Sequence, residues 1–198
     1  MGDPKKPRKK FEKPSHPWII ERINEENELV KNYGLKNKRE VWRTASILRN
    51  WRRQARDLQA RVRRKEPQAE VEMKNLFAKL QNLGILTTEN PTLDDILALN
   101  IESVLSRRLE TIVYTKGLAS SPRQARQMIV HGHISVAGHK VTAPSYLVKK
   151  TEEHTIQYAV QSPLNDPLHP TRPKNPNEVK KTDSATKKEK NAEVKENA

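Results

Sequence analysis

The chain has 198 residues, with 38 Lys and Arg against 24 Asp and Glu, and its formal net charge of +14 at pH 7 favours a polyanionic partner. Only 34% of the residues are hydrophobic, so the chain can bury one modest core or two small ones. The lack of cysteine excludes disulfides and thiolate metal sites, and the lack of a signal peptide or an apolar run of ~20 residues predicts a cytoplasmic protein without a membrane partner.

Residues 1–18 are predicted to form a basic, extended arm. Four prolines prevent a regular helix there, and Trp18 is the expected aromatic anchor at its end. A solvated terminus with no partner is the alternative, but the charge of the remaining chain favours an arm that becomes ordered on RNA. The candidate RNA contacts in the arm are Lys5, Lys6, Arg8, Lys9 and Lys10.

Residues 19–100 are predicted to form a helical scaffold domain. An acidic helix over 19–33 ends at Gly34, and a long helix runs from 40 to 66, before Pro67. A third helix over 69–83 ends at Gly84. Thr92, with Asp95 three residues later, begins a short helix that continues to 99.

The long helix combines an apolar stripe with a row of arginines. The stripe has helical spacing and consists of Val41, Ala45, Leu48, Trp51, Ala55, Leu58 and Val62. One flank of this stripe carries Arg49, Arg52, Arg53, Arg56 and Arg63. A solvated face balanced by acids is the alternative, but the segment offers only Glu40, Asp57 and Glu66. Because an unbalanced row repels itself, RNA contact is the favoured interpretation.

Residues 101–160 are predicted to form an RNA-binding domain of two helices packed on a short sheet, which makes the fold class α+β. The first helix, with Leu105, Leu109, Ile112 and Val113 at helical spacing, ends at Gly117. The second begins at Ser121, with Pro122 and Gln124 as in a capping box. A hairpin follows, with its turn at 137–138, and Tyr146, Val148, Ile156 and Tyr158 are expected to extend the sheet. Arg123 and Arg126 lie near the start of the second helix, where free N–H groups attract phosphate, so an anion-binding ledge is predicted.

Prolines prevent long regular elements over residues 161–176, and 177–198 is predicted to be a disordered basic tail.

The sequence contains little that indicates a catalytic or metal site. Three histidines, His131, His133 and His139, cluster near the hairpin, but no cysteine or nearby carboxylate completes a metal site, and contact with RNA is favoured. Ser121 is better explained as a helix cap than as a nucleophile. We therefore expect no metal, no cofactor and no enzymatic activity.

The runs RRLETIV, GLASSPRQARQMIVHGHISVAGHKV and PSYLV together resemble the RNA-binding domain of small-ribosomal-subunit protein four. The opening GDPKKPRKKFEKPSHPW is similar to the archaeal branch of that family, and the resemblance covers roughly residues 1–170. Two residues depart from the family pattern. Ser106 replaces a frequent acidic residue, and Ala137 replaces the usual Asn, which predicts a different type of hairpin turn because alanine tolerates left-handed backbone poorly.

The resemblance implies a structural protein that binds small-subunit ribosomal RNA at a multi-helix junction in the 5′ region and assembles early. It further implies a position beside ribosomal protein five, near the site where mRNA enters, a contribution to translational accuracy, and a segment 161–176 that packs on the scaffold. The candidate RNA-binding residues of the domain are Arg107, Arg108, Ser120, Ser121, Arg123, Gln124, Arg126, Gln127, His131, His133 and Lys140.

Two other classes of protein use the same small domain. RNA-modifying or aminoacylating enzymes carry it beside a catalytic domain, but residues 19–100 are too short and too helical to supply one. A heat-shock or ribosome rescue factor is the second alternative, and sedimentation with small ribosomal particles would distinguish it.

Overall fold

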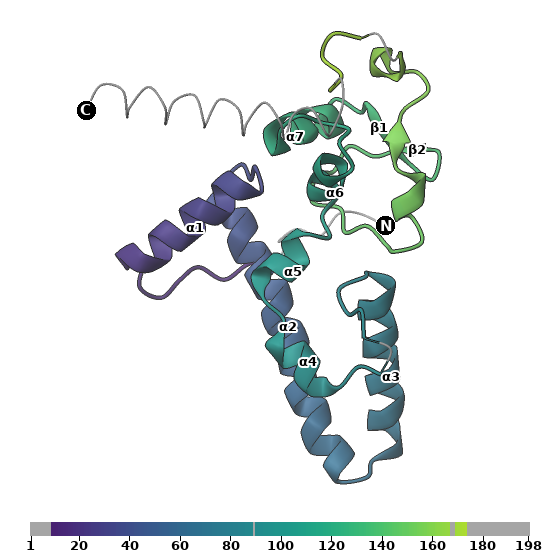
Figure 1. The fold of residues 1–198 in the computed structure, drawn as a ribbon. Helices are drawn as coiled ribbons and strands as arrows, with labels where there is room; N and C mark the ends of the chain where they lie inside the picture. The colour runs from purple at the N-terminus through teal and green to yellow at the C-terminus, as the bar shows by residue number, and fades with distance from the viewer. Residues whose placement is uncertain (1–8, 89, 167–168, 174–198) are drawn as a thin grey trace, which may run out of the picture. The chain divides into compact units, whose positions relative to one another are not determined.

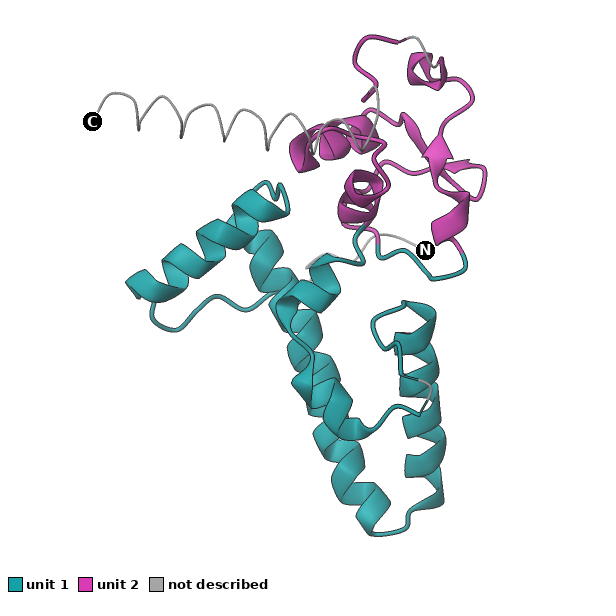
Figure 2. Cartoon of the chain, viewed as in Figure 1, with its two compact units in different colours: residues 1–108, 147–151 teal, residues 109–146, 152–198 magenta. Residues whose placement is uncertain are grey.

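A computed structural model of the chain describes residues 9–88, 90–166 and 169–173 (Figure 1). Helices dominate, and a small three-stranded antiparallel sheet accompanies them, so the predicted α+β class is confirmed. The chain divides into two units, which Figure 2 distinguishes by colour. Unit 1 comprises Met1–Arg108 and Leu147–Thr151, and unit 2 comprises Leu109–Tyr146 and Glu152–Ala198.

The helices of unit 1 begin and end close to the predicted signals. They are α1 (Ile20–Asn32), α2 (Lys38–Arg63), α3 (Pro67–Asn82), α4 (Leu93–Ala98) and α5 (Ile101–Leu105). Gly34 follows α1 with φ 63° and Gly84 follows α3 with φ 66°, the left-handed backbone that favours glycine after a helix. Thr92 and Asp95 form the predicted capping box of α4. Pro67 is the first residue of α3, where its missing N–H costs nothing.

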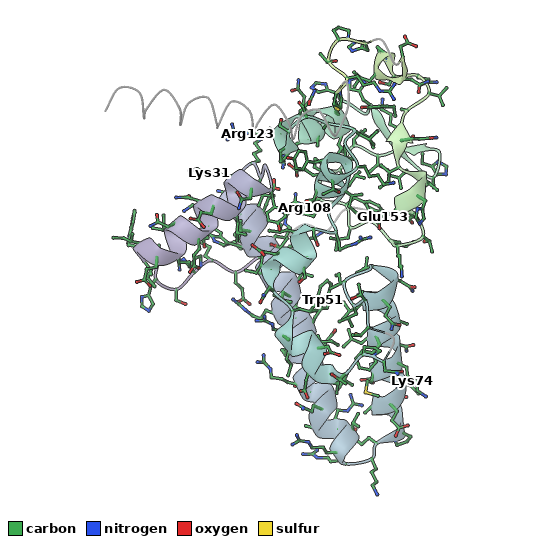
Figure 3. The ribbon with its side chains drawn as sticks, in the orientation of Figure 1. Lys31, Trp51, Lys74, Arg108, Arg123 and Glu153 are labelled. Atoms are coloured by element: carbon green, nitrogen blue, oxygen red, sulfur yellow. The ribbon has the colours of Figure 1, made fainter. Side chains whose placement is uncertain are left out.

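The core of unit 1 is built on α2. Its predicted stripe is buried at Leu48, Trp51, Ala55 and Leu58, and these side chains pack with Leu76 and other apolar residues of α3, α4 and α5 (Figure 3). A second cluster joins Leu35, Val41 and Leu105. Leu105 therefore belongs to unit 1, and the helix that we predicted to continue from it is interrupted before Leu109.

The short segment Leu147–Thr151 completes unit 1. Val148 is fully buried, and its N–H donates to the carbonyl oxygen of Arg107 at 3.0 Å. The N–H of Lys150 donates to the carbonyl oxygen of Asn82 at 2.7 Å. Only one isolated bridge, between Arg108 and Leu147, has strand character here, so Val148 does not extend the sheet as predicted.

Unit 2 packs two helices with the sheet. The helices are α6 (Leu109–Thr115) and α7 (Pro122–Val130), and the strands are β1 (Ile134–Val136), β2 (His139–Lys140) and β3 (Gln157–Tyr158), in the order β2-β1-β3. Short 3-10 turns lie at Glu153–Thr155 and Pro163–Asn165. In the register, Ser135 faces Lys140 on β2 and Gln157 on β3.

The β1–β2 turn has left-handed backbone at both central residues. Ala137 has φ 50° and Gly138 has φ 79°, as the type I′ hairpin turn requires. The prediction that alanine would force another turn type is therefore wrong. The pairing of Val136 with His139 fixes a two-residue loop, and the alanine accepts the strained conformation that this loop imposes.

The predicted return segment 161–176 packs within unit 2 over its described residues, 161–166 and 169–173. Leu164 is buried, and the Arg172 guanidinium lies 4.9 Å from the centroid of the Tyr158 ring. The part of the chain that returns to unit 1 is instead Leu147–Thr151. The predicted tail, 177–198, lies outside the described residues.

Candidate nucleic-acid interface

The start of α7 is organised by hydrogen bonds from its own cap. Ser121 Oγ accepts from the N–H of Gln124 at 3.2 Å, as predicted. Gln124 Oε1 accepts from the N–H of Ser120 at 2.7 Å, one residue before the partner expected in a capping box, and its Nε2 donates to the Thr171 carbonyl oxygen at 3.0 Å. These three predicted contact residues therefore have bonds within the protein that shape the ledge.

An exposed stripe of polar side chains runs along α7. Arg123, Gln127 and His131 lie four residues apart and are all exposed, which places them on one side of the helix. Figure 3 shows the Arg123 side chain extending away from α7, and this side chain is exposed. Lys140 of β2 lies directly over Gly132, so closely that a Cβ on residue 132 would overlap its side chain. We call these four residues, Arg123, Gln127, His131 and Lys140, the α7 stripe.

Arg126 is held differently from Arg123. Its Nη1 lies 3.2 Å from Oε2 of Glu110, whose side chain is only 1% exposed. A buried carboxylate needs such a partner, because desolvation penalises an isolated charge. Arg126 therefore stabilises the packing of α6 and α7, and Arg123 is the more accessible arginine of the predicted ledge.

His133 lies at the end of the stripe, partly buried. Its Nδ1 is 2.9 Å from Ser162 Oγ. Burial, together with the positive charge of His131, Lys140 and His169 when these are protonated, lowers its pKa below the ordinary 6.5. The lowered pKa favours the neutral ring, which contacts Ser162 through Nδ1.

The predicted arginine row of unit 1 lies on α2, but its members differ in their partners. Arg49 pairs with Glu12, and Arg52 donates to the carbonyl oxygen of Leu99. Arg49, Arg52 and Arg56 line a groove of about 390 Å³. The side chains of Arg53, Arg56 and Arg63 are exposed and make no hydrogen bond or ion pair with the described part of the chain.

The partner of Arg49 lies outside the long helix, where the pattern of acids within that helix could not indicate it. Glu12 comes from the arm, and its N–H also donates to Ser46 Oγ at 3.2 Å. A further arginine, Arg61, bonds to Glu66 at 2.8 Å and to Glu72 at 2.7 Å and so serves the α2–α3 junction. In the sequence, the pairing of Arg61 was indicated only by the position of Glu66 just after the long helix.

The described residues of the arm begin at Lys9, which is exposed together with Lys10. Phe11 packs against Trp42 of α2, with ring centroids 6.1 Å apart. Trp18 is 87% exposed, so the predicted anchor is wrong and Phe11 takes that role. The predicted contacts Lys5, Lys6 and Arg8 lie outside the described residues.

Arg107 and Arg108 were predicted to contact RNA, and the structure uses both within unit 1. Arg108 is 2% exposed, and its Nη2 lies 2.6 Å from Glu40 Oε2. Arg107 Nε donates to the Leu83 carbonyl oxygen at 2.7 Å, and Nη2 donates to that of Val148 at 3.4 Å. Contact of Arg108 with a phosphate is therefore corrected to a structural role, because its guanidinium is buried on a carboxylate.

A basic helix stripe beside a small sheet, combined with a second arginine surface, defines a class of RNA-binding protein. Comparison with known proteins supports that class, since residues 107–154 match the S4 domain family. Small ribosomal subunit protein uS4 of Thermoplasma acidophilum is 52% identical over 172 residues, which cover 87% of this chain and 86% of the relative. The proteins of the same name from Methanococcus aeolicus and Picrophilus torridus are also 52% identical over 87% of this chain, covering 96% and 93% of their own lengths.

The chain belongs to the small ribosomal subunit protein uS4 family. This family consists of structural ribosomal proteins, so the enzyme alternative is excluded. None of the helices in the described residues has the length and apolar character required to span a membrane.

Proposed function

We propose that this protein is a structural component of the small ribosomal subunit that binds ribosomal RNA through two surfaces. One is the α7 stripe of unit 2, and the other is the arginine row of unit 1. The observation that carries the proposal is the exposure of Arg53, Arg56 and Arg63 on α2 without partners in the described part of the chain, in a protein of net charge +14. Such a row is stable when anionic phosphates lie against it.

The two surfaces are suited to recognising the shape of a folded RNA rather than its base sequence. An A-form helix hides its base edges in a deep groove, so side chains reach mainly phosphates and 2′-hydroxyls. Arginine recognises phosphate with two parallel N–H donors, and the exposed guanidinium of Arg123 has this geometry available. Most of the affinity then comes from charge and RNA shape.

The finer assignment follows from the resemblance of the sequence to protein four. The bound RNA is a multi-helix junction in the 5′ region, and the protein assembles early, nucleating the subunit. In the cytoplasmic ribosome it lies beside ribosomal protein five, near the site where mRNA enters. From this position it contributes to translational accuracy. Support for this assignment comes from the family relationship and from the charge of the chain.

The salt dependence of RNA binding tests whether α2 contacts phosphates. Replacing Arg53, Arg56 and Arg63 with Gln keeps helix propensity and removes three charges that have no described partner. Each phosphate contact adds roughly 0.7 to 0.9 to the slope of log affinity against log salt, so the slope for small-subunit RNA should flatten by roughly 2 to 2.7.

Arg61→Gln is the matched control. It also removes a charge from α2, but from an arginine that already bonds to Glu66 and Glu72. Its salt slope should equal that of the wild type. An unchanged slope for the triple variant, with helicity confirmed by circular dichroism, would confine RNA binding to the arm and unit 2.

A further inference from the structure

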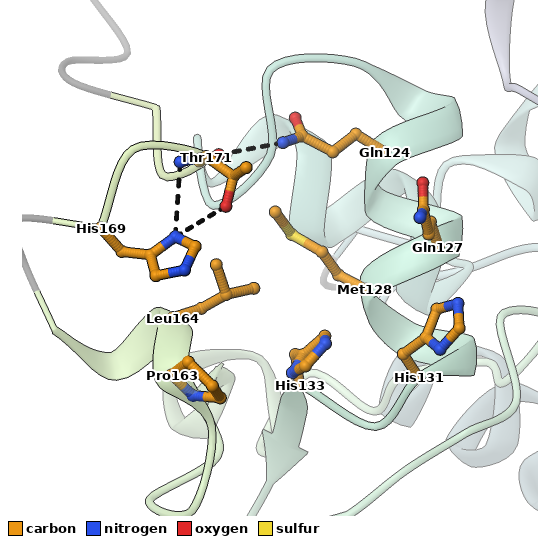
Figure 4. Close-up of a pocket in the computed structure, with 9 residues that line it drawn as sticks. All are labelled: Gln124, Gln127, Met128, His131, His133, Pro163, Leu164, His169 and Thr171. Atoms are coloured by element: carbon orange, nitrogen blue, oxygen red, sulfur yellow. Dashed lines mark hydrogen bonds between the residues drawn. The ribbon is translucent and has the colours of Figure 1, made fainter.

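A pocket of about 230 Å³ opens beside the α7 stripe, between α7 and the described part of the return segment (Figure 4). Its apolar floor is formed by Met128, Pro163 and Leu164. Three imidazoles, those of His131, His133 and His169, stand around it. The two basic residues of the α7 stripe, Arg123 and Lys140, do not line this cavity, whereas Gln127 and His131 do.

Hydrogen bonds hold both walls of the pocket in place. Gln124 Nε2 donates to the Thr171 carbonyl oxygen at 3.0 Å, which ties the return segment to α7. The Thr171 N–H donates to His169 Nδ1 at 3.3 Å, and Thr171 Oγ1 lies 2.7 Å from the same nitrogen. On the opposite side, Ser162 Oγ lies 2.9 Å from His133 Nδ1 and accepts from the Leu164 N–H at 3.2 Å.

The lining suits a flat, uncharged ligand with polar edges. Because His169 Nδ1 accepts a backbone N–H, the neutral ring carries its proton on Nε2 and can donate there. Gln127 adds an exposed amide, which can both donate and accept. No group of His, Cys, Asp or Glu in the described residues is arranged to hold a metal ion. The volume lies below the roughly 300 Å³ at which pockets for drug-sized ligands begin, so one ring system fits better than a larger molecule.

We propose that this pocket receives one unstacked nucleobase of the RNA that lies along the α7 stripe. Gln127 and His131 belong to both the stripe and the pocket, so a strand whose phosphates contact Arg123 and Lys140 passes the mouth of the pocket. Proteins recognise unpaired bases by stacking them on aromatic or imidazole rings and by bonding to their edges, and the lining offers both. The inference rests on the proposed RNA-binding function.

Two variants of the full-length protein remove opposite parts of the pocket. One combines Gln127→Ala with His131→Ala on α7, and the other is His169→Ala on the return segment. The control is Val130→Ala, an apolar residue of α7 that is 52% exposed and does not line the pocket. Each protein is titrated against the organism's own small-subunit ribosomal RNA at pH 8 and at several salt concentrations.

Loss of a stacked base should weaken binding about 5- to 150-fold, with the salt slope unchanged because neither pocket variant removes a lysine or an arginine. Base-specific modification with dimethyl sulfate and carbodiimide gives the second measurement. The wild type and Val130→Ala should protect one unpaired nucleotide that reacts again in both pocket variants, while the rest of the footprint persists.

Arg123→Ala separates the pocket from the proposed function. If Arg123→Ala weakens binding and flattens the salt slope while both pocket variants keep wild-type affinity and protection, the pocket proposal alone is overturned. If the wild type itself shows no salt-dependent binding to this RNA, the proposed function fails, and the pocket proposal fails with it.

Discussion

Arg108 Nη2 lies 2.6 Å from Oε2 of Glu40, and this ion pair joins residues that are 68 positions apart in the sequence. The Arg108 side chain is 3% exposed and that of Glu40 is 15% exposed. Glu40 lies in the first turn of α2, and Arg108 is the last residue of unit 1 before the chain enters unit 2. The ion pair therefore holds the end of the first chain segment of unit 1, at Arg108, against α2.

Arg108→Met should lower the free energy of unfolding by about 3 to 5 kcal/mol, because it leaves a largely buried carboxylate without its main cation. Urea denaturation measures the change. Arg49→Met is the matched control, since its pair with Glu12 is exposed on both sides and should contribute at most about 1 kcal/mol. Equal effects of the two variants would show that the Arg108 pair adds nothing beyond an ordinary surface contact.

Substitutions of Arg123 and Arg126 should affect different properties, RNA binding in the first case and stability of the fold in the second. Arg123→Ala should weaken binding to small-subunit RNA by roughly 1 to 3 kcal/mol and leave the thermal midpoint nearly unchanged, because its side chain is exposed. Arg126→Ala should instead destabilise the domain by about 2 kcal/mol or more, because Glu110 remains buried. Filter binding and thermal melts of both variants measure these effects, and identical behaviour of the two would contradict the assignment.

The hairpin turn offers a stabilising substitution. Ala137 has φ 50°, a conformation that costs an alanine about 1 kcal/mol and that asparagine accepts more readily. Ala137→Asn should therefore raise the free energy of unfolding by about 0.5 to 1 kcal/mol, measured by denaturant titration. Ala143→Asn, in an exposed position without positive φ, should change it by less than about 0.5 kcal/mol.

The stability of the protein should fall as the pH is lowered through the range in which histidine titrates. Burial, reinforced by His131, Lys140 and His169, depresses the pKa of His133 in the folded state below its ordinary 6.5. Well above 6.5 the side chain is neutral in both states and no penalty arises, whereas near and below 6.5 the unfolded chain binds the proton more readily and is favoured. The thermal midpoint should thus decline between about pH 7 and pH 5.

His133→Gln should reduce that decline, because it removes the group whose pKa differs between the states. His139→Gln serves as the control, since His139 is exposed on β2. A pH profile that is the same for the wild type and His133→Gln would assign the effect to other groups.

Local signals in the sequence predicted most of the secondary structure. Gly34, Gly84 and Gly117 follow the predicted helices with positive φ, and Ser121 caps α7 as its spacing indicated. The helical spacing of apolar residues in α2 correctly predicted that Leu48 and other residues on the same face are buried in the core. These features depend on neighbours within a few residues, which is why a sequence pattern can specify them.

Pairing between distant residues was not predictable by the same means. In the sequence, Arg107 and Arg108 form a basic pair beside an RNA-binding motif, and only the fold places Glu40 and the Leu83 carbonyl against them. Glu12 likewise removes Arg49 from the set of unpaired arginines. Charge patterns indicate where cations are abundant, but the acid that neutralises each one is selected by tertiary packing.

The return of Leu147–Thr151 to unit 1 has a consequence for the order of folding during synthesis. The first 108 residues emerge before the segment that supplies buried Val148 and the bond from Lys150 to Asn82. Unit 1 therefore stays incomplete until all of Leu109–Tyr146 has been translated, which takes several seconds at roughly 5 to 20 residues per second. A nascent chain arrested at residue 108 would expose part of its core to chaperones, whereas one released after residue 151 can close it.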